Sequence, residues 1–197
     1  MVSRVLFVGG KWLLYGLSGA VLFCIGLLIA WFLFSLFGGR SLDFLKQVIS
    51  SMGKKFILNE EGLVRSDGKR VNKITEGEMY RSYKDPKGNL TIGVGSLVDT
   101  PEELRISDDL LTAHYVNYLF DRELEVFGRI VRDLVKVPLK QNQFDALVSF
   151  TFNVGPENFK RSRILDDINA GRQITSEHFT AWENHARRLR EFKLFQG

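Results

Sequence analysis

The chain has 197 residues, of which 27 are Lys or Arg and 23 are Asp or Glu, and its formal net charge is +4 at pH 7. Such a weak charge bias argues against a nucleic-acid partner. The single cysteine, Cys24, excludes an intramolecular disulfide and a cysteine-based metal site, and the three histidines lack the HExxH spacing of a zinc hydrolase, so the sequence predicts no metal site.

Residues 12–39 form a long apolar stretch without a charged side chain. About 20 apolar residues are enough for a helix to cross a bilayer. A buried soluble helix would show a polar face, and a cleavable signal peptide has a shorter apolar region of roughly 7 to 15 residues. Trp12, Tyr15 and Trp31 suit the two membrane interfaces. We therefore expect a transmembrane or signal-anchor helix at 12–39, after an N-terminal tail at 1–11.

Residues 40–65 are expected to form a juxtamembrane segment. Basic residues flank the apolar stretch on both sides, so charge does not decide its orientation. An apolar stripe with helical spacing predicts a short amphipathic helix over residues 42–56, which would lie on the membrane surface or against the next domain. The stripe consists of Leu42, Leu45, Ile49, Met52 and Phe56.

The remaining residues, 66–197, are expected to form one domain. Ser66 is a suitable N-cap for a helix that would end between Glu76 and Tyr80. Residues 83–97 alternate strand and turn signals, including the turn sequence DPKG at 85–88. The chain beyond residue 101 reads as helical, with an N-cap at Ser107 and a buried central helix over 143–154 that ends at Gly155-Pro156. The sequence thus predicts an α+β, mainly α fold with a small β-containing lobe and a larger helical lobe.

The segment most indicative of catalysis is EGEMYRSYKDPKGNLTIGVG at residues 76–95. In it, Glu76, Asp85 and Thr91 follow one another at intervals of nine and six. Hydrolysis of a glycosidic bond uses one carboxyl group to protonate the leaving oxygen and a second polar group to activate water. A helix-end Glu followed by a hairpin with Asp and Thr can supply both. Glu61 is also followed by Gly, but Arg70 stands nine residues beyond it, so the spacing favours Glu76.

This segment resembles the catalytic segment of the phage-type lysozymes, or endolysins, of glycoside hydrolase family 24. The resemblance continues through QNQFDALVSFTFNVG (141–155) and FKRSRILDDINAG (159–171) to ARRLREFKLFQG at the end of the chain, so it covers residues 66–197. It implies a two-lobed lysozyme-like fold that cleaves the β-1,4 bond between N-acetylmuramic acid and N-acetylglucosamine in peptidoglycan. It implies no cofactor.

By the same resemblance, Glu76 is the general acid, Asp85 positions the attacking water, and Thr91 helps to hold it, with inversion at the sugar. Asn153 and Trp182 match positions that border the substrate, although Asn153 can equally satisfy a helix end and Trp182 can be a core residue. Arg187 corresponds to a basic residue close to the catalytic Glu. One position departs from the family pattern: Ser96 stands after the second glycine, where the family usually has His.

The sequence therefore predicts a peptidoglycan-degrading muramidase held in the bacterial inner membrane by residues 12–39, with a cytoplasmic N-terminus and a periplasmic catalytic domain. Two alternatives stay open. A non-catalytic peptidoglycan-binding module conflicts with the complete Glu, Asp and Thr set. A pore-forming lysis partner conflicts with a single span that is joined to a complete hydrolase domain.

Overall fold

The computed structural model describes residues 6–8, 11–13, 46–85, 88–97 and 110–197. The chain divides into two compact units, Met1–Arg40 and Ser41–Gly197. In the first unit, β1 (Leu6–Val8) pairs antiparallel with β2 (Lys11–Leu13). Most of the span expected at 12–39 lies outside the described residues, and its first two positions lie in β2 instead of a helix. Within the described residues, no helix is long and apolar enough to cross a membrane.

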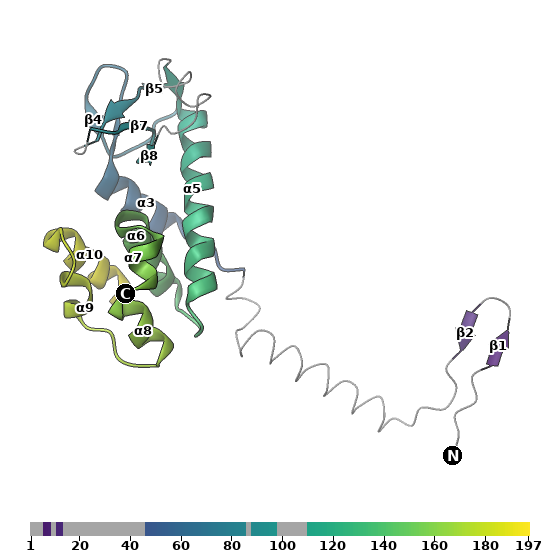
Figure 1. Cartoon of the computed structure of the whole chain (residues 1–197). Helices are drawn as coiled ribbons and strands as arrows, with labels where there is room; N and C mark the ends of the chain where they lie inside the picture. Colours follow the sequence, from purple (N-terminus) through teal and green to yellow (C-terminus); the bar gives the residue numbers. More distant parts are fainter. Residues whose placement is uncertain (1–5, 9–10, 14–45, 86–87, 98–109) are drawn as a thin grey trace. The chain divides into compact units, whose positions relative to one another are not determined.

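The second unit is mainly helical with small antiparallel sheets, as the sequence predicts (Figure 1). The short strands gather near one end of the long helix α5, and helices α6 to α10 pack near its other end. In chain order the elements are α3 (Ser51–Glu61), β3 (Leu63–Val64), β4 (Arg70–Val71), β5 (Met79–Tyr80), β6 (Tyr83–Lys84), β7 (Leu90–Ile92), β8 (Ser96–Leu97), β9 (Leu111–Thr112), α5 (Ala113–Leu134), α6 (Gln141–Val154), α7 (Pro156–Lys160), α8 (Arg163–Asn169), α9 (Ser176–Thr180) and α10 (His185–Gln196).

Helix α3 differs from the amphipathic helix expected over residues 42–56. It begins after Ser50, whose hydroxyl accepts a hydrogen bond from the Gly53 amide at 3.1 Å and whose own amide donates to Asp145 on α6 at 3.0 Å. This hydrogen bond to a buried carboxylate fixes the helix start. Of the expected stripe, Ile49 and Phe56 are partly buried against the core. Met52 is 68% exposed, whereas Ile57 is fully buried. Helix α3 therefore contributes to the same core as the later helices, although the domain was expected to begin near residue 66.

The helix expected between Ser66 and Tyr80 was a wrong prediction. Strands β3 and β4 form a hairpin there, and its turn closes with a 2.8 Å hydrogen bond from the Gly68 amide to the Arg65 carbonyl. Gly68 has φ +85°, a left-handed conformation that favours glycine and breaks a helix. Gly77 has φ +80° in a second turn, so Glu76 lies in a turn and not at a helix end.

Strands β6, β7 and β8 form a three-stranded antiparallel sheet, so the strands and turns expected between residues 83 and 97 are confirmed. Tyr83 is opposite Thr91 in the register, and the turn between β6 and β7 is closed by a 2.9 Å hydrogen bond from the Gly88 amide to the Asp85 carbonyl. Gly93 and Gly95 then reverse the chain with positive φ angles of 58° and 81°.

The predicted central helix is confirmed as α6, which contacts α3, α5 and α10. It buries Phe144, Leu147 and Phe150 completely, and it ends at Gly155, whose φ of +89° stops the helix before Pro156. The N-cap expected at Ser107 lies outside the described residues. Helix α5 begins instead after Thr112, whose hydroxyl accepts from the Tyr115 amide at 3.2 Å.

Candidate active site

The last residue of α3, Glu61, points its carboxyl group toward the C-terminal helix. Arg187 on α10 donates to Glu61 Oε1 at 2.7 Å, and the exposed fractions of the two side chains are 3% for Arg187 and 21% for Glu61. Gly62 then ends the helix with φ +67°. A carboxyl group is thereby fixed at a helix end, partly open to solvent.

Arg187 is held in turn by a buried charged network beneath it. Glu191, which has no exposed surface, accepts hydrogen bonds from Arg187 Nε at 3.0 Å and from the Ser149 hydroxyl at 2.8 Å. Its other carboxylate oxygen accepts from Arg188, which also donates to the Asn153 side chain. This network joins α6 to α10, and it leaves Nη1 of Arg187 to bind Glu61.

The charges in this network shift one another's protonation equilibria. Burial raises the pKa of Glu191 above its ordinary value, against the opposing effect of Arg188 and Arg187. Burial alone would lower the pKa of Arg187, but the negative charges of Glu61 and Glu191 raise it overall. Arg187 therefore remains a cation and keeps its attraction for Glu61.

The hairpin β6–β7 carries the other two predicted site residues. The Asp85 carboxylate accepts hydrogen bonds from the Asn89 amide at 2.8 Å and from the Asn89 side chain at 3.0 Å. Thr91 is 2% exposed, and its hydroxyl donates to the Asn89 carbonyl at 3.2 Å. Side chains two residues apart on a strand share a face, so the pairing of Tyr83 with Thr91 puts Asp85 and Thr91 on the same face of this hairpin.

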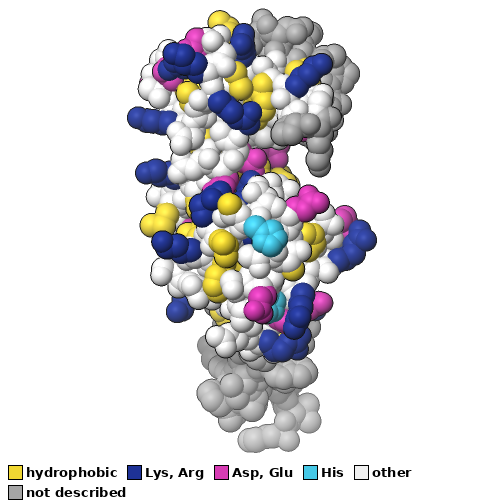
Figure 2. Space-filling model, turned by 90° about the vertical axis from the view of Figure 1, so that its left-hand side faces the viewer, with side chains coloured by type: hydrophobic (Ala, Val, Ile, Leu, Met, Phe, Trp, Pro, Cys, Tyr) yellow, Lys and Arg dark blue, Asp and Glu magenta, His cyan; other side chains and the backbone are white. Residues whose placement is uncertain are grey.

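Tyr83, the first residue of this hairpin, carries a hydroxyl that responds to the nearby charges. Burial raises the pKa of the Tyr83 hydroxyl, and the negative charges of Glu61 and Asp85 both add to that rise. Glu61 Oε2 also lies 4.0 Å from the position that a Cβ of Gly95 would occupy. Glu61 and the glycine turn that follows Thr91 are thus neighbours. Figure 2 shows a recess with acidic side chains where this face of the molecule narrows.

Glu76 lies elsewhere. It is exposed in the turn before Gly77, and within the described residues no interaction joins it to Asp85, Thr91 or Arg187. The β3–β4 hairpin and the loop after it lie between Glu61 and Asp85, so an interval of nine residues cannot indicate Glu61. The signal that indicates Glu61 is the glycine that follows it, which marks the end of a helix.

Three further expectations concern side chains around the site. Asn153 is bound to Arg188 rather than to a helix end. Trp182 is partly buried and packs edge-on against Phe150, with ring centroids 5.5 Å apart, so it contributes to the core while keeping some exposed surface. The Ser96 hydroxyl is buried and finds no hydrogen-bond partner among the described residues.

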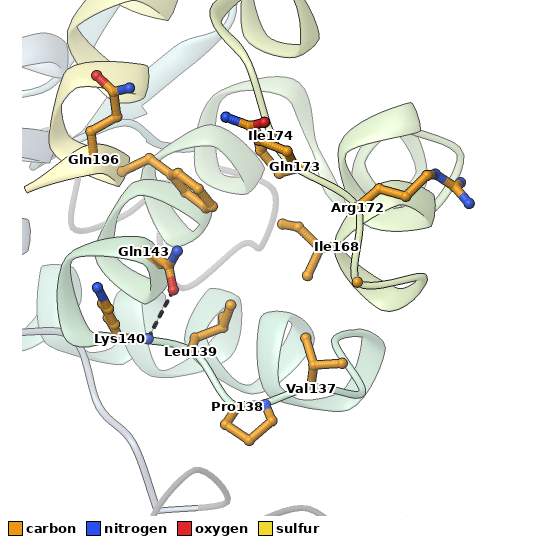
Figure 3. Close-up of a pocket in the computed structure, with 12 residues that line it drawn as sticks. Val137, Pro138, Leu139, Lys140, Gln143, Ile168, Arg172, Gln173, Ile174 and Gln196 are labelled. Atoms are coloured by element: carbon orange, nitrogen blue, oxygen red, sulfur yellow. Dashed lines mark hydrogen bonds between the residues drawn. The ribbon is translucent and has the colours of Figure 1, made fainter.

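A cavity of about 460 Å³ lies between the start of α6, the segment that joins α8 to α9, and the end of α10 (Figure 3). Gln143 points into it and accepts a hydrogen bond from the Lys140 amide at 3.0 Å. Its described lining contains neither Asp nor Glu, so it lacks a group that could act as the acid in glycoside hydrolysis. The described residues also contain no cluster of His, Cys, Asp or Glu able to hold a metal ion.

Proteins of known structure share this fold. Residues 73–193 match the phage lysozyme family. An endolysin of Salmonella phage P22 is 33% identical over 141 residues, which are 67% of this chain and 97% of the relative. A SAR-endolysin of bacteriophage PS119 is 32% identical over 96 residues, 49% of this chain and 55% of the relative. The solved muramidase domain of SpmX from Asticaccaulis excentricus superposes with a TM-score of 0.59 at 29% identity, over 76% of this chain and 97% of that one. The chain therefore belongs to the phage lysozyme family and is a glycoside hydrolase of the lysozyme type.

Proposed function

We propose that this lysozyme cleaves the β-1,4 bond between N-acetylmuramic acid and N-acetylglucosamine in peptidoglycan, with Glu61 as the general acid and with Asp85 and Thr91 positioning the attacking water. The observation that carries the proposal is that Glu61, held by Arg187, lies beside the glycine turn that follows Thr91, with its Oε2 4.0 Å from the position of a Cβ on Gly95. The names of the relatives, endolysin and muramidase domain, support the substrate.

Each residue has a distinct role in this mechanism. Arg187 holds Glu61 Oε1, so the second oxygen, Oε2, is available to donate the proton to the leaving sugar oxygen. Asp85 is held by two hydrogen bonds from Asn89 and accepts a proton from water, and the Thr91 hydroxyl helps to orient that water. A water molecule between the acid and the base gives attack from the opposite face of the sugar and inversion of the anomeric centre.

Glutamine variants at the two candidate acids distinguish this assignment from the one that the sequence spacing predicts. We expect Glu61→Gln to reduce peptidoglycan hydrolysis by about 10²-fold or more, because the amide has no proton to give to the leaving group. Glu76→Gln is the matched control and should retain close to full activity. A large loss in Glu76→Gln with an active Glu61→Gln would restore Glu76 as the acid. Full activity in both would contradict either assignment.

The chemistry of the water can be tested separately. Asp85→Asn should reduce hydrolysis severely, and Thr91→Ala should reduce it less, because the carboxylate and not the hydroxyl accepts the proton. The first sugar released should be the α-anomer, as detected by NMR during the reaction. Predominant β-anomer would contradict inversion. A purified wild-type chain that binds peptidoglycan without releasing reducing sugar would favour the non-catalytic binding module.

We also propose that residues 12–39 hold the enzyme in the inner membrane, with the N-terminus in the cytoplasm and residues 40–197 in the periplasm. The 28-residue stretch without a charge and the similarity to a protein named SAR-endolysin support this topology. A periplasm-active reporter fused after Gly197 should be active, and a cytoplasm-active reporter should be silent. The opposite pattern would separate the enzyme from its substrate and overturn the topology.

A further inference from the structure

Two cavities follow one another along α3. The first, of about 620 Å³, lies between the Ser51–Asn59 part of α3 and residues 72–73. The second, of about 390 Å³, lies between the end of α3, including Glu61, and residues 70–72. Asn59 and Asn72 line both cavities, so the two are adjacent and form one groove, here called the α3 groove. The α3 groove reaches the proposed acid.

The α3 groove has an apolar floor and a basic rim. Leu58 and the aliphatic stems of lysine side chains supply apolar surface. Lys54 is committed to Asp121, at 2.6 Å. Lys55 and Lys73 are exposed, and neither makes an ion pair with any residue in the part of the chain that the structure describes. Figure 2 shows further Lys and Arg side chains over the strand-bearing part of the molecule. The rim of the first cavity is therefore complementary to carboxylates, whereas the second cavity also contains Glu61 and Glu60, which is paired with Arg190.

The dimensions of the α3 groove suit a short peptide. From Ser51 to Glu61 the helix α3 rises about 15 Å, because each step from one residue to the next in an α-helix adds about 1.5 Å. An extended peptide covers that distance with four or five residues. The amide side chains of Asn59 and Asn72 lie midway along the groove, where they can both donate to and accept from a peptide backbone.

We propose that the α3 groove binds the short acidic peptide attached to the N-acetylmuramic acid residues of the substrate, and this rests on the proposed function. Lys55 and Lys73 pair with the peptide carboxylates, and Asn59 and Asn72 bind its backbone. Arg70, which donates to the Glu61 carbonyl at 3.1 Å and lies over the Tyr83 ring, borders the groove at the catalytic end. Strand β4 and the loop after it thus supply a wall of the groove that would determine specificity.

The test compares soluble glycan chains that carry their peptides with the same chains after an amidase has removed them. The full-length protein, kept in detergent, is assayed as wild type and as the double variant Lys55→Glu/Lys73→Glu. Two lost charge pairs should lower kcat/KM about tenfold on peptide-bearing chains, and kcat/KM on peptide-free chains should stay unchanged. The control Lys136→Glu/Lys193→Glu makes the same charge change at two exposed positions outside the groove and should leave both values unaltered.

Several results would overturn the proposal. An equal loss on both substrates would indicate a general effect of charge or folding. An unchanged preference for peptide-bearing chains, together with loss of binding to vesicles of anionic lipid, would assign the groove to the membrane surface instead. Direct binding of the free peptide, measured by fluorescence anisotropy, separates this proposal from the proposed function. If wild type cleaves neither substrate, the proposed function fails, and binding that is weakened by the double variant still supports the groove.

Discussion

The two carboxyl groups of the candidate site are held in different ways. Glu61 is held by Arg187, which lies 126 residues later in the chain and belongs to a buried network between α6 and α10. Asp85 is held by Asn89, which lies only four residues away in the same turn. The position of Glu61 therefore depends on the packing of the whole helical part, whereas the position of Asp85 depends on one hairpin. Substitutions around the first should affect stability and activity together, and substitutions around the second should affect activity alone.

The largest effect is expected from Glu191→Ala. The substitution leaves two buried arginines without their shared carboxylate, and breaking a buried ion pair in this way typically costs about 3 to 5 kcal/mol of unfolding free energy. Arg187 would also lose one of its supports, so hydrolysis should fall as well. Thermal unfolding and a peptidoglycan-clearing assay measure the two effects. Glu183→Ala, at an exposed position, is the control, and equal stability of the two variants would contradict the role given to the network.

The contact between α3 and α6 is the next place to disturb Glu61 from a distance. A Cβ added at Gly53 would lie 2.6 Å from Asp145 Cγ, so Gly53→Ala should cost about 1 to 3 kcal/mol through overpacking. The helical Gly128 has 3.4 Å or more to its nearest neighbours, so Gly128→Ala should be neutral or stabilise by up to about 1 kcal/mol. Equilibrium unfolding in urea should therefore show a loss of unfolding free energy for Gly53→Ala and no loss for Gly128→Ala. A similar loss of unfolding free energy in both variants would exclude the close approach of α3 and α6 as the cause.

The comparison of the two carboxyl groups also explains what the sequence could predict. The β6–β7 hairpin is encoded locally, by DPKG and the glycines after Thr91, and the sequence predicted it. Helix α6 could equally be predicted, because it is largely apolar and ends at Gly155-Pro156. The sequence predicted a helix over residues 42–56, but α3 begins at Ser51. Its start is fixed by a hydrogen bond to Asp145, a contact across 95 residues.

The spacing did not indicate Glu61, the general acid that we propose, for the same physical reason. A fixed interval between two catalytic residues holds only while the chain between them has a fixed length, and a hairpin inserted at the surface changes the interval without moving either residue in space. The ion pair with Arg187 is a tertiary contact that no local pattern encodes. The family resemblance implied that Arg187 lies close to the catalytic Glu, and in the structure Arg187 pairs with Glu61.

The pH dependence of stability should reveal a third carboxyl group, Asp167 on α8, which is held by charged neighbours in the helical part of the molecule. Hydrogen bonds from His178, at 2.7 Å, and from Arg172 lower the pKa of Asp167 to about 2. The ordinary value is 3.8, so the stabilisation by Asp167 is complete above about pH 4 and is lost as the pH falls toward 2. Asp167→Asn should reduce the slope of unfolding free energy against pH in that window. The exposed Asp133→Asn should leave the slope unaltered, and an equal reduction by both variants would exclude Asp167 as its source.

The smallest effect on stability is expected where the site is held locally. Asn89→Ala removes the side-chain hydrogen bond to Asp85 Oδ2 but leaves the backbone bond to Oδ1 in place. Asn89 is exposed, so the unfolding free energy should change by less than about 0.5 kcal/mol. Loss of one hydrogen bond to a charged group should still reduce hydrolysis about tenfold, because Asp85 could rotate away from the attacking water. Asn158→Ala removes a comparable exposed hydrogen bond at α7 and should leave hydrolysis unchanged. If Asn89→Ala lost stability to the same extent as activity, the hairpin would depend on wider packing, and the difference between the two carboxyl groups would disappear.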